Sequence, residues 1–147
     1  MTRSLEISIF ILRIATGGLF IYDGLSKILA KVWSAAPTLL QAQFLPELFS
    51  WFADPARLDT INFLNEWGLL LIGIGLVLGL HVRLAALFGM LLMALYYIMT
   101  LGIPLISPTE FLFDRHIVYF CVFLVLYAAD AGEFWGLDGK ISIRFGD

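Results

Sequence analysis

The sequence is short of charge and has almost no cysteine, and both shortages exclude classes of protein. Charged residues make up 14% of its 147 residues, and the net charge of −3 comes without a run of basic side chains. Soluble domains carry about a quarter charged residues, and nucleic-acid-binding surfaces need clustered Lys and Arg. Cys121 is the only cysteine, so we expect no internal disulfide and no C-x-x-C pair. We therefore expect neither a soluble domain nor a nucleic-acid partner.

Motifs for bound cofactors are also missing. The two histidines, His81 and His116, are expected near opposite membrane faces and so cannot ligate one haem iron. Two histidines and one cysteine give no zinc or iron–sulfur ligand set. The chain has neither a G-x-G-x-x-G nor a P-loop motif. We expect no metal or haem bound by this chain alone, so any electrons must come from a partner or a diffusible carrier.

Long apolar segments dominate what is present, since 61% of the residues are hydrophobic. About 20 apolar residues in a helix span a bilayer, and a helix satisfies its own backbone polar groups there. Four helices are predicted on this basis, at about residues 5–30, 61–80, 84–101 and 114–131. The sequence therefore predicts an all-α integral membrane protein, with one domain over residues 1–147 that forms an antiparallel four-helix bundle.

The connection over residues 31–60 is unusually long and rich in proline and aromatic residues. Proline breaks helices, and Trp is enriched at membrane interfaces. We predict an interfacial segment between the first two helices, which is either a loop packed over the bundle or a lid over a binding site. Residues 132–147 are polar enough to form a tail outside the membrane.

Ionisable side chains within the apolar segments are the candidate functional residues, because charges in a membrane are costly and usually face partners or polar cavities. Because the four predicted helices alternate in direction, several of these side chains are expected at the same depth in the membrane. A quinone ring needs donors to its carbonyl oxygens, a proton-delivering acid or histidine, and an apolar slot. The candidate catalytic residues are Lys27 on a quinone oxygen, His116 or Glu66 for proton delivery, and Asp23 to hold Lys27. The candidate quinone-binding residues are Lys27, Tyr96 and Tyr119.

A purely structural role is the alternative for these charges, since buried ion pairs can fix helix packing without doing chemistry. At the opposite depth, Arg13 and Asp130 are predicted to form such a structural ion pair. The glycines of the first two predicted helices indicate close helix packing: Gly17, Gly18, Gly24, Gly68, Gly73, Gly75 and Gly79.

Three stretches carry a family resemblance. The first is the pattern of Arg13, Gly17, Gly24 and Lys27; the others are LNEWGLLLIGIGLVLGLHVRLAALFG and AADAGEFWGLD. Together they resemble the DoxX/DoxD family. The resemblance implies a four-helix membrane protein, and DoxD is a subunit of thiosulfate:quinone oxidoreductase. The polar positions that match the family are Arg13, Lys27, Glu66 and Arg83.

The leading functional hypothesis is a membrane subunit of a redox complex that binds or protonates quinone, as in a thiosulfate:quinone oxidoreductase. A partner subunit would supply the electrons. The first alternative is a non-catalytic accessory subunit of a larger complex. The alternative that we rank last is a pathway for a small molecule or protons. We expect contacts with lipids and other protein subunits in the inner (cell) membrane of a prokaryote. If Lys27 and Arg115 are internal, the excess of Lys and Arg places both termini in the cytoplasm.

Overall fold

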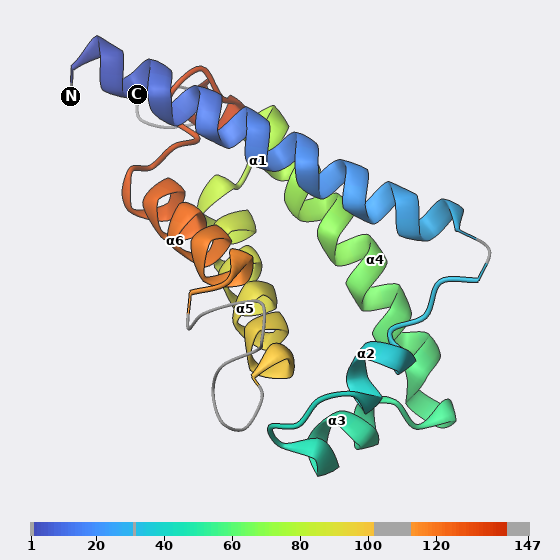
Figure 1. Cartoon of the computed structure of the whole chain (residues 1–147). Helices are drawn as coiled ribbons and strands as arrows, with labels where there is room; N and C mark the ends of the chain where they lie inside the picture. Colours follow the sequence, from blue (N-terminus) through green and yellow to red (C-terminus); the bar gives the residue numbers. More distant parts are fainter. Residues whose placement is uncertain (1, 31, 102–112, 141–147) are drawn as a thin grey trace.

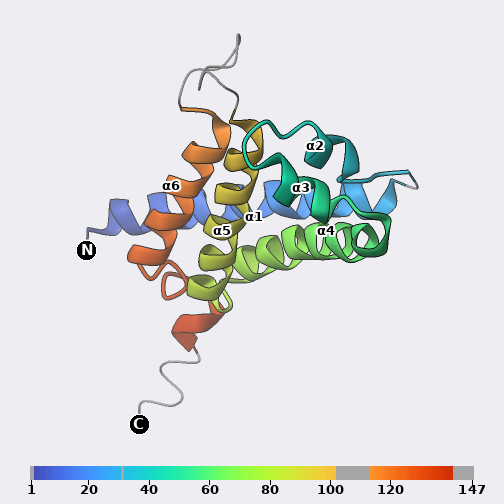
Figure 2. The ribbon, with the colours of Figure 1, turned by 90° about the horizontal axis from the view of Figure 1, so that it is seen from below.

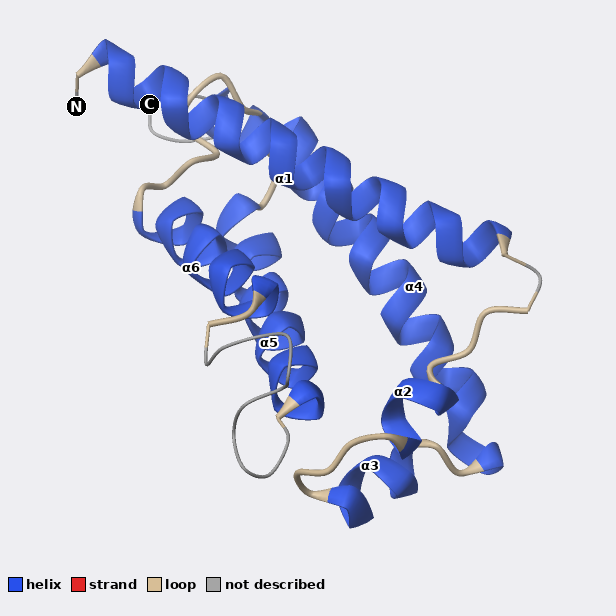
Figure 3. Cartoon of the chain, in the orientation of Figure 1, coloured by secondary structure: helices blue, strands red, loops and turns tan. Residues whose placement is uncertain are grey.

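The computed structural model describes residues 2–30, 32–101 and 113–140, and this part of the chain contains helices, turns and loops but no strand (Figures 1 and 3). The prediction of an all-α fold is confirmed for these residues. The predicted tail is therefore described only as far as Lys140. The helices are α1 (Arg3–Leu29), α2 (Ala36–Leu40), α3 (Pro46–Phe52), α4 (Pro55–Leu78), α5 (Val82–Thr100) and α6 (Arg115–Ala128).

Three of these helices, α1, α4 and α5, are long and apolar enough to cross a membrane, and α6 is a shorter apolar helix. Large apolar side chains also point away from the protein along them, such as Ile11, Leu71 and Leu91. An exposed apolar surface of this extent is unfavourable in water and is typical of helices surrounded by lipid. The prediction of membrane-spanning helices is therefore supported.

The long helices are arranged as two pairs. α1 packs along α4 and α5 packs along α6, whereas the contact of α4 with α5 is smaller and that of α1 with α6 smaller still. Figure 2 shows that the α5–α6 pair crosses the α1–α4 pair instead of running alongside it. The antiparallel four-helix bundle is therefore not confirmed by this arrangement. Phe20 and Phe123, which stack edge to face with centroids 5.0 Å apart, join the two pairs in the core.

The segment predicted as a connection over residues 31–60 contains two short helices and the start of a long one. α4 begins at Pro55 instead of near residue 61, because Pro55 suits the first turn of a helix and Asp54 caps it. The carboxylate of Asp54 accepts a hydrogen bond from the backbone N–H of Ala56 at 2.8 Å. The other end of the segment is tied to α4, since the backbone N–H of Ala35 donates to the side chain of Asn62 at 2.9 Å.

Glycines allow α1 and α4 to approach until their backbones touch. A Cβ atom added to Gly73 would lie 2.6 Å from the backbone nitrogen of Ile21, and one added to Gly24 would lie 2.6 Å from that of Leu70. A Cβ atom added to Gly17 would lie 2.9 Å from the backbone oxygen of Gly73. The predicted packing role is confirmed at these three glycines.

Two other predicted packing glycines have no such role. A Cβ atom added to Gly18 or Gly68 would meet nothing within 4 Å. Gly75 packs near Ala85 of α5, and Gly79 ends α4 in the left-handed conformation, with φ of 65°. The glycines that matter for the α1–α4 contact are therefore those that face the partner helix, a property that the sequence alone does not give.

The predicted ion pair between Arg13 and Asp130 is wrong. Arg13 is fully buried, and its guanidinium donates hydrogen bonds to the backbone carbonyls of Ala131, Phe134 (3.0 Å) and Trp135 (3.5 Å). The chain after α6 turns back towards α1, so backbone oxygens and not the Asp130 carboxylate reach the guanidinium. Asp130 instead pairs with Arg83, whose Nη2 lies 2.7 Å from Oδ2.

The same C-terminal turn also caps α5. The Asp138 carboxylate accepts hydrogen bonds from the backbone N–H groups of His81 (2.7 Å) and Val82 (2.9 Å), which are free donors at the start of that helix. The backbone N–H of Asp138 donates to the carbonyl of Gly79 at 2.9 Å. The AADAGEFWGLD stretch therefore has a structural role, in which it joins α1, α4 and α5 at one end of the molecule.

We expect Gly73→Ala to lower the free energy of unfolding by about 1–3 kcal/mol, because the added methyl group meets backbone that cannot move aside. Gly18→Ala is the matched control, since it lies on α1 facing open space. It should be neutral or gain up to about 1 kcal/mol from helix propensity. Unfolding of the detergent-solubilised protein, followed by circular dichroism, measures both. Equal stability of the two variants would contradict the glycine contact.

Candidate ligand-binding cavity

A cavity of about 550 Å³ lies where both helix pairs meet residues 33–52, which contain α2 and α3 and are called the α2–α3 segment below. Its walls come from α1, α4, α5, the first residues of α6, and the chain between Trp33 and Phe52. A volume of several hundred cubic ångströms is typical of sites that bind small molecules. The polar side chains that line it are Lys27, Thr38, Asn65, Tyr96, Thr100, Arg115 and His116.

Lys27, Asn65 and Tyr96 form a polar cluster on one wall. The ammonium group of Lys27 donates to Asn65 Oδ1 at 2.8 Å and to the hydroxyl oxygen of Tyr96 at 3.3 Å. Asn65 Nδ2 donates to the same hydroxyl oxygen at 2.5 Å. Three different helices, α1, α4 and α5, therefore converge on one hydrogen-bonded group. Such partners are needed because an uncompensated charge in a membrane costs about 2.5–3.5 kcal/mol.

Among the residues that the structure describes, this cluster leaves some hydrogen-bond donors unused. An ammonium group has three N–H bonds, of which Lys27 uses two within the cluster. The hydroxyl oxygen of Tyr96 accepts two hydrogen bonds, which occupy both of its lone pairs and leave its O–H free to donate. Because both side chains line the cavity, a ligand oxygen there could accept from each of them.

Aromatic rings surround the ammonium group of Lys27. Its Nζ atom lies 4.5 Å from the centroid of the Trp33 ring and 5.6 Å from that of Tyr96. A cation over the face of an aromatic ring is stabilised by the ring quadrupole. Trp33 comes from the segment after α1, so this contact also ties the α2–α3 segment to the cavity. The remaining walls are apolar side chains, such as Leu39, Phe49 and Leu92.

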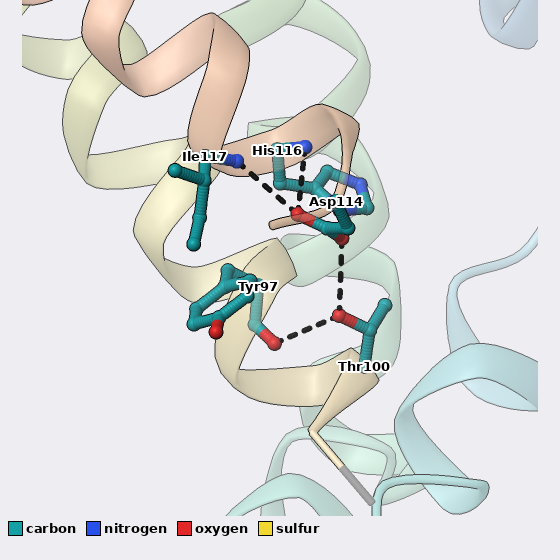
Figure 4. A network of polar contacts seen from close by, with 5 residues as sticks. All are labelled: Tyr97, Thr100, Asp114, His116 and Ile117. Atoms are coloured by element: carbon teal, nitrogen blue, oxygen red, sulfur yellow. Dashed lines mark hydrogen bonds and ion pairs between the residues drawn. The ribbon is translucent and has the colours of Figure 1, made fainter. Parts of the chain in front are cut away.

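Asp114 and His116 form a second polar group beside the cavity, at the start of α6 (Figure 4). Asp114 caps the helix, because its Oδ1 atom accepts from the backbone N–H groups of His116 (2.9 Å) and Ile117 (3.2 Å). Its Oδ2 atom lies 2.5 Å from Nδ1 of the His116 ring and 3.4 Å from the hydroxyl of Thr100. Both carboxylate oxygens are therefore engaged.

The hydrogen bonds keep Asp114 ionised. Asp114 precedes α6 and lies outside the three long apolar helices. Burial acts to raise the pKa of Asp114, but the hydrogen bonds from the His116 ring and from the backbone of His116 and Ile117 outweigh it, so that the pKa lies below its usual 3.8. An ionised carboxylate can only accept hydrogen bonds, so Nδ1 of His116 is the donor.

This contact determines which nitrogen of His116 is left for a ligand. With Nδ1 donating to Asp114, Nε2 is the ring atom able to accept or deliver a proton. The His116 ring lines the cavity and packs edge to face against Tyr96, with centroids 5.7 Å apart. An imidazole ring therefore lies next to the cluster of Lys27 and Tyr96 in the same cavity.

The structure brings together some of the predicted site residues and separates others. Lys27, Tyr96 and His116 line the cavity. Asp23, Glu66 and Tyr119 are not among its lining residues. Tyr119 packs in the core, where its ring lies edge to face with Phe20 at 6.1 Å.

The two predicted carboxylates act on Lys27 from a distance. Asp23 and Glu66 are electrostatic neighbours of Lys27. Among the residues that the structure describes, neither has an oxygen within 4.0 Å of the ammonium group. They therefore offset part of its charge, whereas Asn65 and Tyr96 provide the direct hydrogen bonds.

Sequence reasoning did not select Asn65 or Asp114 as site residues. Asn65 directly precedes Glu66, and a polar residue within an apolar helix is itself a usable signal. Asp114 stands just before an apolar run, which is typical of a helix N-cap. Within residues 2–30, 32–101 and 113–140, no group of three or more His, Cys, Asp or Glu side chains is placed to hold a metal ion.

A model of the DoxX family matches residues 8–101, which run from α1 to the end of α5. The chain belongs to the DoxX family. The match includes Lys27, Asn65 and Tyr96, whereas Asp114 and His116 lie beyond it. The comparisons with curated proteins and with solved structures give no match. Membership of the DoxX family and the three apolar helices together identify a membrane protein.

We expect Asp114→Ala to lower the free energy of unfolding at pH 7 by about 0.5–2 kcal/mol, because α6 loses its cap. The pKa of Asp114 is lower in the folded protein than its usual 3.8, so the contribution of the carboxylate is complete above about pH 4. It is lost as the pH falls through the lower, folded-state pKa. The stability difference between wild type and variant should therefore shrink only below about pH 4.

Thermal unfolding in detergent from pH 7 down to about pH 3 measures this difference. Asp54→Ala is the matched control, since Asp54 also caps a helix but is exposed and accepts a single backbone hydrogen bond. It should cost less stability than Asp114→Ala. A loss for Asp114→Ala that equals that of the control, or that disappears well above pH 4, would contradict the assigned contacts.

Proposed function

We propose that the cavity binds the headgroup of a quinone and that this DoxX protein is the membrane subunit of a redox complex. The reaction class that we infer is that of a thiosulfate:quinone oxidoreductase, in which a partner subunit supplies the electrons. The observation that carries the proposal is the cavity itself, which combines unused donors of Lys27 and Tyr96 with His116 and apolar walls.

The residues present fit a quinone headgroup. A quinone accepts two electrons and two protons, and its carbonyl oxygens accept hydrogen bonds. Lys27 and Tyr96 would hold one such oxygen with their unused N–H and O–H groups. His116 would deliver or take up a proton through Nε2 while Asp114 holds its Nδ1 atom. The apolar side chains, among them Leu39 and Phe49, would exclude water and receive the ring and the start of an isoprenoid tail.

The role of Lys27 follows from its surroundings. Its amine is held inside the molecule by two hydrogen bonds and an aromatic ring. An ammonium group next to a carbonyl oxygen favours negative charge that develops on that oxygen. Asp23 and Glu66 would limit this effect by offsetting part of the charge from outside the cavity. The inferred setting is the inner membrane of a prokaryote, with both termini in the cytoplasm.

A non-catalytic accessory subunit is the second candidate function. Such a subunit needs packing surfaces but no internal space next to Lys27. The cavity beside this side chain favours ligand binding over a purely structural role. Arg13, by contrast, fits a structural role, because in the described part of the chain its hydrogen bonds go to backbone carbonyls.

A binding experiment in lipid nanodiscs tests the proposal, with decylubiquinone as the probe. Trp33 lines the cavity, so a bound quinone should quench its fluorescence in a saturable manner. We expect Lys27→Met to weaken binding by roughly tenfold, which corresponds to about 1.4 kcal/mol and is typical of a lost hydrogen bond to a charged group. Tyr96→Phe should weaken binding as well.

Exposed residues supply the controls. Lys140→Met and Tyr22→Phe remove the same groups outside the cavity, where both side chains are exposed, and should leave binding unchanged. Trp33→Phe should remove the saturable part of the quenching and leave the part caused by quinone dissolved in the lipid. The proposal fails if Lys27→Met, shown by circular dichroism to be folded, binds the probe as tightly as Lys140→Met.

A further inference from the structure

The α2–α3 segment has apolar side chains on two opposite sides. On the inner side, Leu39 and Phe49 are buried, with exposed fractions of 6% and 2%. They pack with apolar residues at the start of α4 and the end of α5. On the outer side, Leu40, Leu48 and Trp51 keep exposed fractions of 66%, 44% and 52%. A helix at the surface of a soluble protein would instead place polar residues on its outer side.

The α3 helix divides into three faces. Phe49 and Phe52 face the protein, where both line the cavity. Leu48 and Trp51 lie three positions apart and so share an outer, apolar face. Glu47 is exposed on a polar face next to it. A helix with an apolar and a polar face outside a protein contact is suited to the boundary between acyl chains and headgroups.

The α2–α3 segment lies level with the ends of the membrane-spanning helices, where the boundary between acyl chains and headgroups is expected. Its buried side packs on Leu58, near the start of α4, and on Met99, near the end of α5. The segment therefore lies where these helices begin and end, beside the lower part of α4 in Figure 1. Phe63, a little further along α4, is also exposed and apolar, and Leu64 next to it is exposed where it lines the cavity. The outer face of α3 thus continues the apolar surface of the spans.

We propose that Leu48 and Trp51, together with Leu40, rest in the lipid bilayer, so that the α2–α3 segment is a cover between the cavity and the membrane. The partner of this surface is lipid and not water, a second copy or another protein. The charges over residues 36–60 are Glu47, Asp54, Arg57 and Asp59, and the only basic one, Arg57, is already held by Asp54 at 3.4 Å and by the Trp51 ring at 4.1 Å. Without a basic cluster, attachment depends on apolar burial and not on anionic headgroups.

This inference also affects the cavity, because the inner side of the same cover lines it through Leu39, Phe49 and Phe52. A ligand dissolved in the acyl chains would need to pass only this cover to reach Lys27. The lipid contact of the cover does not depend on the proposed function, since it concerns the outer face alone. Its test therefore needs no quinone and can fail or succeed independently.

Spin labels in the full-length protein provide the test. Cys121 is replaced first, by Cys121→Ser, and a nitroxide is then attached after Leu48→Cys in nanodiscs. Glu47→Cys is the matched control on the same helix, Leu71→Cys marks the lipid-exposed middle of α4, and Lys140→Cys marks an exposed site in the C-terminal segment. Power saturation with oxygen and with the water-soluble complex NiEDDA reports the surroundings of each label, because oxygen concentrates in lipid and NiEDDA in water.

We expect the label at Leu48 to collide mainly with oxygen, as at Leu71, and that at Glu47 to meet NiEDDA more often. The result should not change when anionic lipid is added to a zwitterionic bilayer. NiEDDA accessibility at Leu48 as high as at Lys140 would overturn the proposal in favour of water. Low accessibility to both reagents would overturn it in favour of a protein partner or a second copy.

Discussion

The backbone contact between α1 and α4 is the constraint on which the rest of the structure depends. Gly17 and Gly24 of α1 and Gly73 of α4 leave no room for a side chain between the two helices. The contact fixes the rotation of α1, and with it the directions of Arg13 and Lys27, which lie towards opposite ends of that helix. Arg13 therefore contacts the C-terminal turn, and Lys27 lines the cavity. A small rotation of α1 would separate both from their partners.

Arg13 and Lys27 of α1 are held in different ways, and the difference matters for function. Arg13 is fully buried, and its hydrogen bonds go to backbone carbonyls, a set of acceptors with no proton to exchange. Lys27 has side-chain partners, Asn65 and Tyr96, and stands next to open space. Buried charges without such space usually have a structural role, whereas charges at the wall of a cavity are candidates for binding.

Much of the fold could be predicted from the sequence, because apolar runs of sufficient length determine which segments become helices. Antiparallel threading predicted that Lys27, Tyr96 and His116 share a depth, and in the structure these three side chains line the same cavity. Threading does not give the rotation of each helix, and neighbouring residues on a helix point about 100° apart. For this reason Glu66 was chosen where Asn65 forms the contact. The choice of Asp130 failed for a different reason, since the turn after α6 directs carbonyls at Arg13.

The enclosure of Arg13 has a consequence for the order in which the molecule is completed. Its acceptors lie at Ala131, Phe134 and Trp135, more than a hundred positions further along the chain. During synthesis α1 enters the bilayer long before these carbonyls exist. Until then the guanidinium of Arg13 must be solvated by water or lipid headgroups. Before the last turn emerges, α1 can already pack on α4, but its guanidinium lacks these acceptors, so a chain that stops short of Ala131 would leave Arg13 without its hydrogen bonds.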